Sequence, residues 1–226
     1  MKRQFVIGNI LLLLLLLNGC AEKRQEAEEV QVSEENTGIT QVLEEDTGIV
    51  QVLSGTSCGS GIVYEITEQD LVVLTAGHVL SAEEATVELV FGDNVHVQGE
   101  KCLISDMADI AFVTVKRSDI PKEQQLMYQS ASVDKEKFDA LRAGTKLYLS
   151  GFSEETKVGI LRESWIYVED FGQYMMLLDG VIVPGMSGGG VFDEAGNLMG
   201  ILCGGNESGE TVAVPLSVIL AVYELL

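Results

Sequence analysis

The sequence predicts an all-β fold, a sandwich or a barrel, on three observations. From about residue 50 onward, short apolar segments are separated by glycines and polar turns. The 226 residues include 24 glycines and only three prolines, and 46% of them are hydrophobic, which is enough for a sizeable core. The apolar segments do not alternate with helical patterns, as the strands of a parallel sheet would. Antiparallel strands joined by tight turns are therefore expected.

The N-terminus has the pattern of a secretory signal. Cationic residues precede an apolar run from Phe5 to Leu17, which is shorter than the ~20 residues that span a bilayer. The tetrapeptide that ends at Cys20 resembles the lipobox of bacterial lipoproteins, although Asn18 is an unusual residue there. We expect residues 1–19 to be a lipoprotein signal peptide. The resemblance implies a lipid on Cys20 and anchoring to a bacterial cell membrane, with the protein facing the extracellular or periplasmic side.

An acidic segment follows the signal. Between residues 21 and 46 the chain has nine acidic and two basic residues, and we expect residues 20–50 to be a solvated, disordered tether. A ten-residue repeat occupies 34–43 and 44–53. Two copies are too few for a solenoid, so we interpret the repeat as a spacer whose second copy extends into the first strand.

The first half of the folded region contains several predicted strands. Residues 61–67 alternate between apolar and polar, which is typical of a half-buried strand, whereas Leu71–Leu74 is apolar on both faces and should be central. Further strands are expected at 85–91, 95–98 and 109–115. Together these segments predict a first barrel at about residues 51–120, within a folded domain of residues 51–226.

The second half has the same pattern of short apolar segments separated by glycines and polar turns, after a polar connection from Lys116 to Gly144. We expect a helix from Val133 to Arg142, capped by Ser132, within this connection. Strands are predicted at 146–150, 158–168, 173–179, 198–203 and 211–214, giving a second barrel at about 145–215. A final amphipathic helix is predicted from Leu216 to Leu226 after Pro215.

A serine in a glycine-rich heptapeptide, residues 184–190, is the main candidate for chemistry. A flexible glycine loop is one interpretation, and a nucleophilic Ser187 is the other. A nucleophilic serine needs an imidazole base, an acid that orients it and donors for an oxyanion. Of the two histidines, His96 lies in an alternating strand and is expected at the surface. His78 ends an apolar strand at a glycine turn, so it is the candidate base.

Two other families with glycine-rich motifs are disfavoured. The motif fits the G-x-S-x-G elbow of α/β-hydrolases, but in that fold the histidine follows the serine, and here both histidines precede Ser187. A P-loop is excluded because no lysine follows the glycines. We expect no cofactor and no metal.

The order histidine, acid, serine resembles that of chymotrypsin-fold, trypsin-like serine proteases, and it is most similar to bacterial HtrA/Deg-type peptidases. The resemblance covers about residues 55–220 and implies two antiparallel six-stranded β-barrels with a short C-terminal helix. Six segments carry it: Thr75-Ala76-Gly77-His78, Asp109-Ile110-Ala111, Gly185-Met186-Ser187-Gly188-Gly189, Gly59-Ser60-Gly61, Ser150-Gly151-Phe152 and Asp179. Gly77 stands where the family has alanine.

The resemblance implies a serine endopeptidase that acts on proteins or peptides. Ser187 would be the nucleophile, His78 the base and Asp109 the acid, with Asp106 as the less favoured acid. The N–H groups of Gly185 and Ser187 would form the oxyanion hole. The substrate pocket would be bounded by Val181, Cys203, Gly204 and Gly205, and without an acid at its floor it predicts cleavage after small or medium apolar residues. The alternative is a non-catalytic or conditionally active surface-binding module with the same fold.

The remaining features concern regulation and partners. Digestive relatives have an aspartate where Met186 stands, so activation by insertion of a new N-terminus is not expected. The sequence ends at Leu226, and we expect no PDZ domain. If Cys20 is lipidated, at most one disulfide can join the three other cysteines, which we expect to be mostly buried thiols. The net charge of −21 disfavours nucleic-acid binding.

Overall fold

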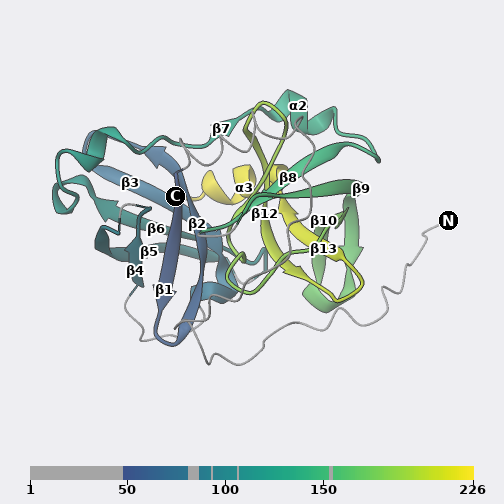
Figure 1. Ribbon diagram of the computed structural model, residues 1–226, viewed down its shortest axis with the longest axis horizontal. Coiled ribbons are helices and arrows are strands. Elements are labelled where there is room, and N and C mark those ends of the chain that lie inside the picture. Colours follow the sequence, from purple (N-terminus) through teal and green to yellow (C-terminus); the bar gives the residue numbers. More distant parts are fainter. Residues whose placement is uncertain (1–47, 81–86, 93, 106, 153–154) are drawn as a thin grey trace, which may run out of the picture.

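Two β-barrels lie side by side in the computed structural model, which describes residues 48–80, 87–92, 94–105, 107–152 and 155–226 (Figure 1). The predicted signal peptide, the lipidation site at Cys20 and nearly all of the predicted tether lie outside the described residues.

The first barrel contains six antiparallel strands and is closed. Their order around the barrel is β1-β2-β3-β6-β5-β4, and β1 closes it by pairing with both β2 and β4. The second copy of the sequence repeat supplies β1, as expected. The bounds are β1 (Ile49–Ser54), β2 (Ser57–Ile66), β3 (Asp70–Ala76), β4 (Val87–Val90), β5 (His96–Ser105) and β6 (Ile110–Lys116).

The second barrel also contains six antiparallel strands. Its order is β8-β9-β10-β13-β12-β11, and β11 closes it by pairing with both β12 and β8. The bounds are β8 (Lys146–Ser150), β9 (Lys157–Val168), β10 (Gln173–Asp179), β11 (Gly190–Phe192), β12 (Asn197–Gly205) and β13 (Glu210–Pro215). The expected all-β fold with two six-stranded antiparallel barrels is confirmed.

The connection between the barrels differs from the prediction of one helix at 133–142. Ser132–Val133 is a short strand, β7, that pairs in parallel with β12, and the Ser132 hydroxyl bonds to Asn197 at 2.8 Å. Because Ser132 is committed to that pairing, the helix cap falls on Asp134, which accepts from the Lys137 N–H at 3.0 Å. The resulting helix α2 spans only Lys135–Asp139. Short 3-10 helices are η2 (Gly77–Leu80), η3 (Arg117–Asp119), η4 (Gln124–Leu126) and η5 (Glu169–Phe171).

The C-terminal helix α3 (Leu216–Tyr223) joins the cores of the two barrels. It follows Pro215 as predicted, and Figure 1 shows it between the barrels. Leu216 packs into the core of the second barrel, while Ile219 and Val222 belong to the apolar cluster that includes the first. The Tyr223 ring lies 4.7 Å from that of Tyr64, and its hydroxyl bonds to Glu65. The helix therefore restricts the movement of one barrel relative to the other.

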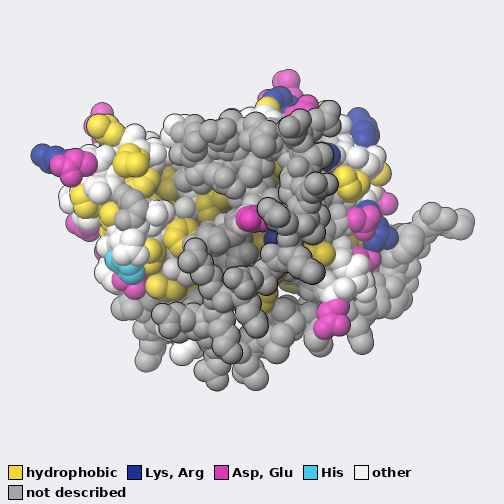
Figure 2. All heavy atoms as spheres, in the orientation of Figure 1, with side chains coloured by type: hydrophobic (Ala, Val, Ile, Leu, Met, Phe, Trp, Pro, Cys, Tyr) yellow, Lys and Arg dark blue, Asp and Glu magenta, His cyan; other side chains and the backbone are white. Residues whose placement is uncertain are grey.

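The described surface is mixed in character. Figure 2 shows acidic and basic side chains together at the outer edge of the second barrel, with apolar side chains between charged ones on the first. In the part of the chain that the structure describes, no helix has the length and apolarity needed to cross a bilayer.

Candidate active site

His78 lies in η2, immediately beyond the central strand β3 of the first barrel. Strand β3 pairs with β6 up to Ala76 and Ile110, so the residues that follow Ala76 lie beside those that precede Ile110. The Gly77 N–H donates to the Asp109 carbonyl at 2.9 Å. A Cβ on residue 77 would lie 3.2 Å from the Asp109 backbone and carboxylate, so glycine relieves this tight approach.

The Asp109 carboxylate holds His78 at two points. The His78 backbone N–H donates to Oδ1 at 2.8 Å, and Nδ1 lies 2.9 Å from Oδ2. A carboxylate only accepts hydrogen bonds, so Nδ1 carries the proton in the neutral ring and Nε2 is left as the acceptor. Asp109 has φ of +49°, a left-handed conformation that aspartate tolerates better than most residues.

Cys203 from the second barrel donates its thiol to the Ile201 carbonyl at 3.7 Å and interacts electrostatically with this carboxylate. Its side chain is 3% exposed. Burial raises the pKa of the Cys203 thiol well above its usual value, and the negative charge of Asp109 and its hydrogen bond with the thiol raise it further. Cys203 is therefore a neutral thiol. The sequence placed it in the wall of the substrate pocket and missed this interaction with Asp109.

Ser187 lies in the loop between β10 and β11, and that loop begins with a tight turn. The Met186 N–H donates to the Val183 carbonyl at 3.1 Å, Pro184 is the second residue of the turn, and Gly185 has φ of +98°. Proline followed by a residue with positive φ is the signature of a type II turn. The Met186 side chain is fully buried in the core of the second barrel, which anchors the loop from below.

Two glycines allow Ser187 to approach the first barrel. A Cβ on Gly188 would lie 2.1 Å from the Ser60 carbonyl oxygen and 3.0 Å from the Ala76 nitrogen. A Cβ on Gly59 would lie 2.8 Å from the Ser187 carbonyl oxygen and 2.7 Å from Val79. Gly188 thus lies against the end of β3, which leads into His78, and the Ser187 carbonyl lies against Gly59, which is packed on Val79 next to His78. Within the described residues, no hydrogen bond joins Ser187 to His78.

Two backbone N–H groups of this loop, those of Gly185 and Ser187, differ from the two that follow them along the chain. The Gly188 N–H donates to the Leu202 carbonyl at 2.8 Å, and the Gly189 N–H donates to the Met186 carbonyl at 2.9 Å. The N–H groups of Gly185 and Ser187 donate to no acceptor among the described residues. Backbone N–H groups that lack a protein acceptor beside a candidate nucleophile suit the binding of an anionic oxygen.

Apolar side chains surround the glycines that the sequence assigned to the substrate pocket. A Cβ on Gly204 would lie 3.1 Å from the Phe171 ring, and one on Gly205 would lie 3.1 Å from Ile182. Val181 is 56% exposed beside the turn at Gly209. Sequence patterns did not single out Phe171 or Ile182, because η5 and the loop after β10 approach β12 only in the folded barrel.

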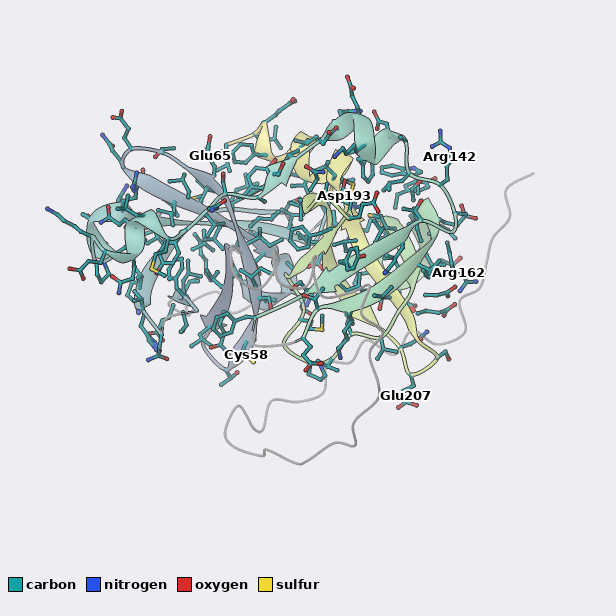
Figure 3. The ribbon with its side chains drawn as sticks, turned by 45° about the horizontal axis from the view of Figure 1, so that its top comes forward. Cys58, Glu65, Arg142, Arg162, Asp193 and Glu207 are labelled. Atoms are coloured by element: carbon teal, nitrogen blue, oxygen red, sulfur yellow. The ribbon has the colours of Figure 1, made fainter. Side chains whose placement is uncertain are left out.

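Asp179, which belongs to a motif of the resemblance, does not take part in the site. It pairs with Arg162 at 3.3 Å, and Arg162 also bonds to Glu210 at 2.7 Å. Figure 3 labels Arg162 at the outer side of the second barrel. His96 is exposed on β5 and bonds to Glu88 at 3.1 Å, as expected for a surface residue. Asp106, the alternative acid, lies outside the described residues.

No disulfide joins any two of the three described cysteines. Cys203 is buried and Cys58 is half-buried at the end of the first barrel, where Figure 3 labels it. The expectation of mostly buried thiols is wrong for Cys102, which is exposed. The reason is that β5 continues to Ser105, well beyond the predicted end, and its alternation turns Cys102 outward.

Comparisons with known proteins place this geometry in a family. The model of the trypsin-like peptidase domain matches residues 59–201. No sequence of a curated protein matches the chain. Among solved structures, the inactive form of the Rv3671c protease superposes with a TM-score of 0.66 at 15% identity, covering 87% of this chain and 98% of that one.

A second solved structure has the same fold. The HtrA-type protease AlgW, determined with a tripeptide, superposes with a TM-score of 0.67 at 20% identity. The match covers 83% of this chain, which spans 63% of that structure. Because the family model matches more than half of the sequence and the same two-barrel fold recurs in both structures, the chain belongs to the trypsin-like peptidase domain family and is a serine endopeptidase of the chymotrypsin fold, similar to HtrA-type proteases.

Proposed function

We propose that this serine endopeptidase hydrolyses peptide bonds through His78, Asp109 and Ser187, by way of an acyl-enzyme intermediate. The observation that carries the assignment is the 2.9 Å contact between His78 Nδ1 and Asp109, at the junction where the Ser187 loop packs against the end of β3. A base, its orienting acid and a serine from the other barrel therefore converge on one junction.

The proposed chemistry uses each group in turn. Ser187 Oγ attacks the scissile carbonyl carbon while His78 Nε2 takes the hydroxyl proton. The tetrahedral intermediate collapses, the C–N bond breaks, and His78 returns the proton to the leaving amine. Water then attacks the acyl-enzyme with the same proton transfers and releases the carboxylic acid. The Asp109 carboxylate stabilises the imidazolium in both steps, and it keeps Nδ1 as the protonated nitrogen.

The oxyanion of each tetrahedral intermediate would accept hydrogen bonds from the Gly185 and Ser187 N–H groups. Their lack of a protein acceptor among the described residues supports this role. The type II turn supports it as well, because its third residue requires a positive φ that glycine adopts without strain.

The pocket supports cleavage after small or medium apolar residues. Phe171 and Ile182 lie beside the glycines at the end of β12, and Val181 lies beside the turn at Gly209. A lysine or arginine side chain placed among these apolar groups would lose its hydration without gaining a counter-charge.

The N-terminal sequence supports membrane anchoring. Lipid chains on Cys20 would hold the enzyme at the outer side of a bacterial cell membrane, and two or more chains give stable anchoring. The acidic segment from residue 20 to about 50 would then separate the barrels from the lipid surface.

Replacing the proposed nucleophile distinguishes the hypothesis of a serine protease from that of a non-catalytic binding module. The variant Ser187→Ala should lose labelling by a peptidyl phosphonate and lower kcat by about 10⁶-fold, as in other serine proteases. The matched control is Ser54→Ala, since Ser54 is fully buried in the first barrel and its hydroxyl has no hydrogen-bond partner among the described residues. A wild-type chain that shows no Ser187-dependent labelling would instead support the non-catalytic module.

The acid is tested by comparing two aspartates that are three positions apart. Asp109→Asn presents an amide N–H to His78 Nδ1, which favours the wrong tautomer, and kcat should fall by about 10⁴-fold with little change in thermal stability. Asp106→Asn should keep activity within about twofold of wild type, because the proposed chemistry gives Asp106 no role. A larger loss from Asp106→Asn than from Asp109→Asn would contradict the assignment.

Cleavage specificity is measured with a peptide library that varies the residue before the scissile bond. We expect kcat/KM for alanine, valine or leucine to exceed that for lysine by about 10²-fold, because an unpaired ammonium is costly to bury. Val181→Asp should raise the relative rate for lysine. A strong wild-type preference for lysine or arginine would refute the apolar pocket.

Anchoring is tested in cells that express the full chain with an alkyne fatty acid. Wild-type protein should take up the lipid label and sediment with membranes, whereas Cys20→Ser should do neither. Cys58→Ser serves as the control and should behave as wild type. Unchanged labelling and sedimentation of Cys20→Ser would contradict lipidation at this residue.

A further inference from the structure

Ser60 on β2 is fully buried, and each of its polar atoms forms a hydrogen bond, most of them with the second barrel. Its hydroxyl donates to the Gly185 carbonyl at 2.7 Å and accepts from the Phe152 N–H at 2.9 Å. Its N–H donates to the Ser187 carbonyl at 2.7 Å, and its carbonyl accepts from the Thr75 hydroxyl at 2.7 Å. The first-barrel motif Gly59-Ser60-Gly61 therefore reaches directly into the candidate oxyanion loop.

We propose that Ser60 is a positioning residue of the oxyanion hole, which it holds in its donating form by binding the carbonyl groups of Gly185 and Ser187. The inference rests on the proposed function of this loop and adds a residue to it. Ser60 touches neither substrate nor reacting atoms in this account. It acts through the peptide groups of the loop.

Peptide planarity explains how one residue can fix the loop. The Gly185 carbonyl and the Met186 N–H belong to one rigid peptide, which Ser60 Oγ holds at one end and the Val183 carbonyl at the other. The Ser187 carbonyl and the Gly188 N–H form a second peptide, held by the Ser60 N–H and the Leu202 carbonyl. The peptide after Gly185 and the peptide after Ser187 are thus each held by hydrogen bonds at both the carbonyl and the N–H.

The Met186–Ser187 peptide, which lies between these two, is also fixed, so the Pro184–Gly185 peptide is the one in this turn that can rotate. The Met186 carbonyl accepts from the Gly189 N–H at 2.9 Å, and this orients the Ser187 N–H of the same peptide. For the Pro184–Gly185 peptide, which carries the Gly185 N–H, no hydrogen bond occurs among the described residues. A flip of that peptide would convert the type II turn to type I and require φ of Gly185 to become negative. By holding the Gly185 carbonyl, Ser60 Oγ fixes the neighbouring Gly185–Met186 peptide, against which the Pro184–Gly185 peptide would have to turn.

The second-barrel motif Ser150-Gly151-Phe152 completes the arrangement. The Phe152 N–H donates to the Ser60 hydroxyl, so the hydroxyl proton is directed toward the Gly185 carbonyl. A Cβ on Gly151 would lie 3.0 Å from both Ser60 Oγ and the Met186 Cα, so this position favours glycine. Two motifs that the catalytic chemistry does not use therefore meet at one hydroxyl group.

The test compares three buried substitutions in the full chain. Ser60→Ala removes the side-chain bond to Gly185 but keeps the backbone bond to Ser187. We expect its kcat on a peptide substrate to fall about 10- to 100-fold, less than the 10²–10³ lost when a donor itself is removed. The KM should stay within about twofold. Affinity for a peptidyl trifluoromethyl ketone, which forms an oxyanion on Ser187, should fall in parallel with kcat/KM.

The controls separate positioning from stability. Ser54→Ala makes the same change of atoms at a fully buried residue of the same barrel, and Thr75→Val breaks the bond to the Ser60 carbonyl while leaving the Ser60 hydroxyl in place. Both should keep kcat within about threefold of wild type. Ser60→Cys, nearly isosteric but a weaker donor, gives the same readout if Ser60→Ala does not fold.

Two results would overturn the inference, and they differ from failure of the proposed function. An unchanged kcat in Ser60→Ala, or a loss of ketone affinity no greater than that of a non-reacting product peptide, would show that Ser60 does not orient the donors. If the wild-type chain showed no Ser187-dependent hydrolysis, the proposed function itself would fail, and the inference with it.

Discussion

The hydrogen bond from the Ser60 N–H to the Ser187 carbonyl, 2.7 Å long, is the contact on which the candidate site depends. It joins β2 of the first barrel to the β10–β11 loop of the second, and it requires the two backbones to approach more closely than side chains would allow. Gly59 and Gly188 make that approach possible, because a Cβ at either position would overlap the opposite chain. The loop of the candidate nucleophile can thus lie against the first barrel because Gly59 and Gly188 carry no side chains.

The acid of the site is fixed by a similar convergence. The Asp109 carboxylate accepts from the His78 backbone N–H and from Nδ1. Two donors of His78 in the first barrel hold this carboxylate, and Cys203 of the second barrel interacts with it. Such an arrangement keeps the imidazole in a single orientation, which a base must have before substrate arrives. Helix α3 supports it by packing into both cores.

Local patterns predicted most of the strands, because alternation and β-branched composition are properties of neighbouring residues. They failed where a distant partner decides the structure. Strand β11, which has only three residues, was not predicted, and Ser132 pairs with β12 instead of capping a helix. In the site, ordered motifs identified His78, Asp109 and Ser187 as candidates. The bond from the Ser60 hydroxyl to Gly185 spans 125 positions, and neither it nor the interaction of Cys203 with Asp109 leaves a periodic signal.

We infer that both barrels build one catalytic site at the Ser60–Ser187 junction. A crystal structure of the wild-type chain after reaction with a peptidyl phosphonate tests it most directly. We expect phosphorus bonded to Ser187 Oγ and a phosphonyl oxygen about 3 Å from the nitrogen atoms of both Gly185 and Ser187. We also expect His78 Nδ1 to stay on Asp109. Phosphorus on another residue, or a phosphonyl oxygen that meets neither N–H, would contradict this inference.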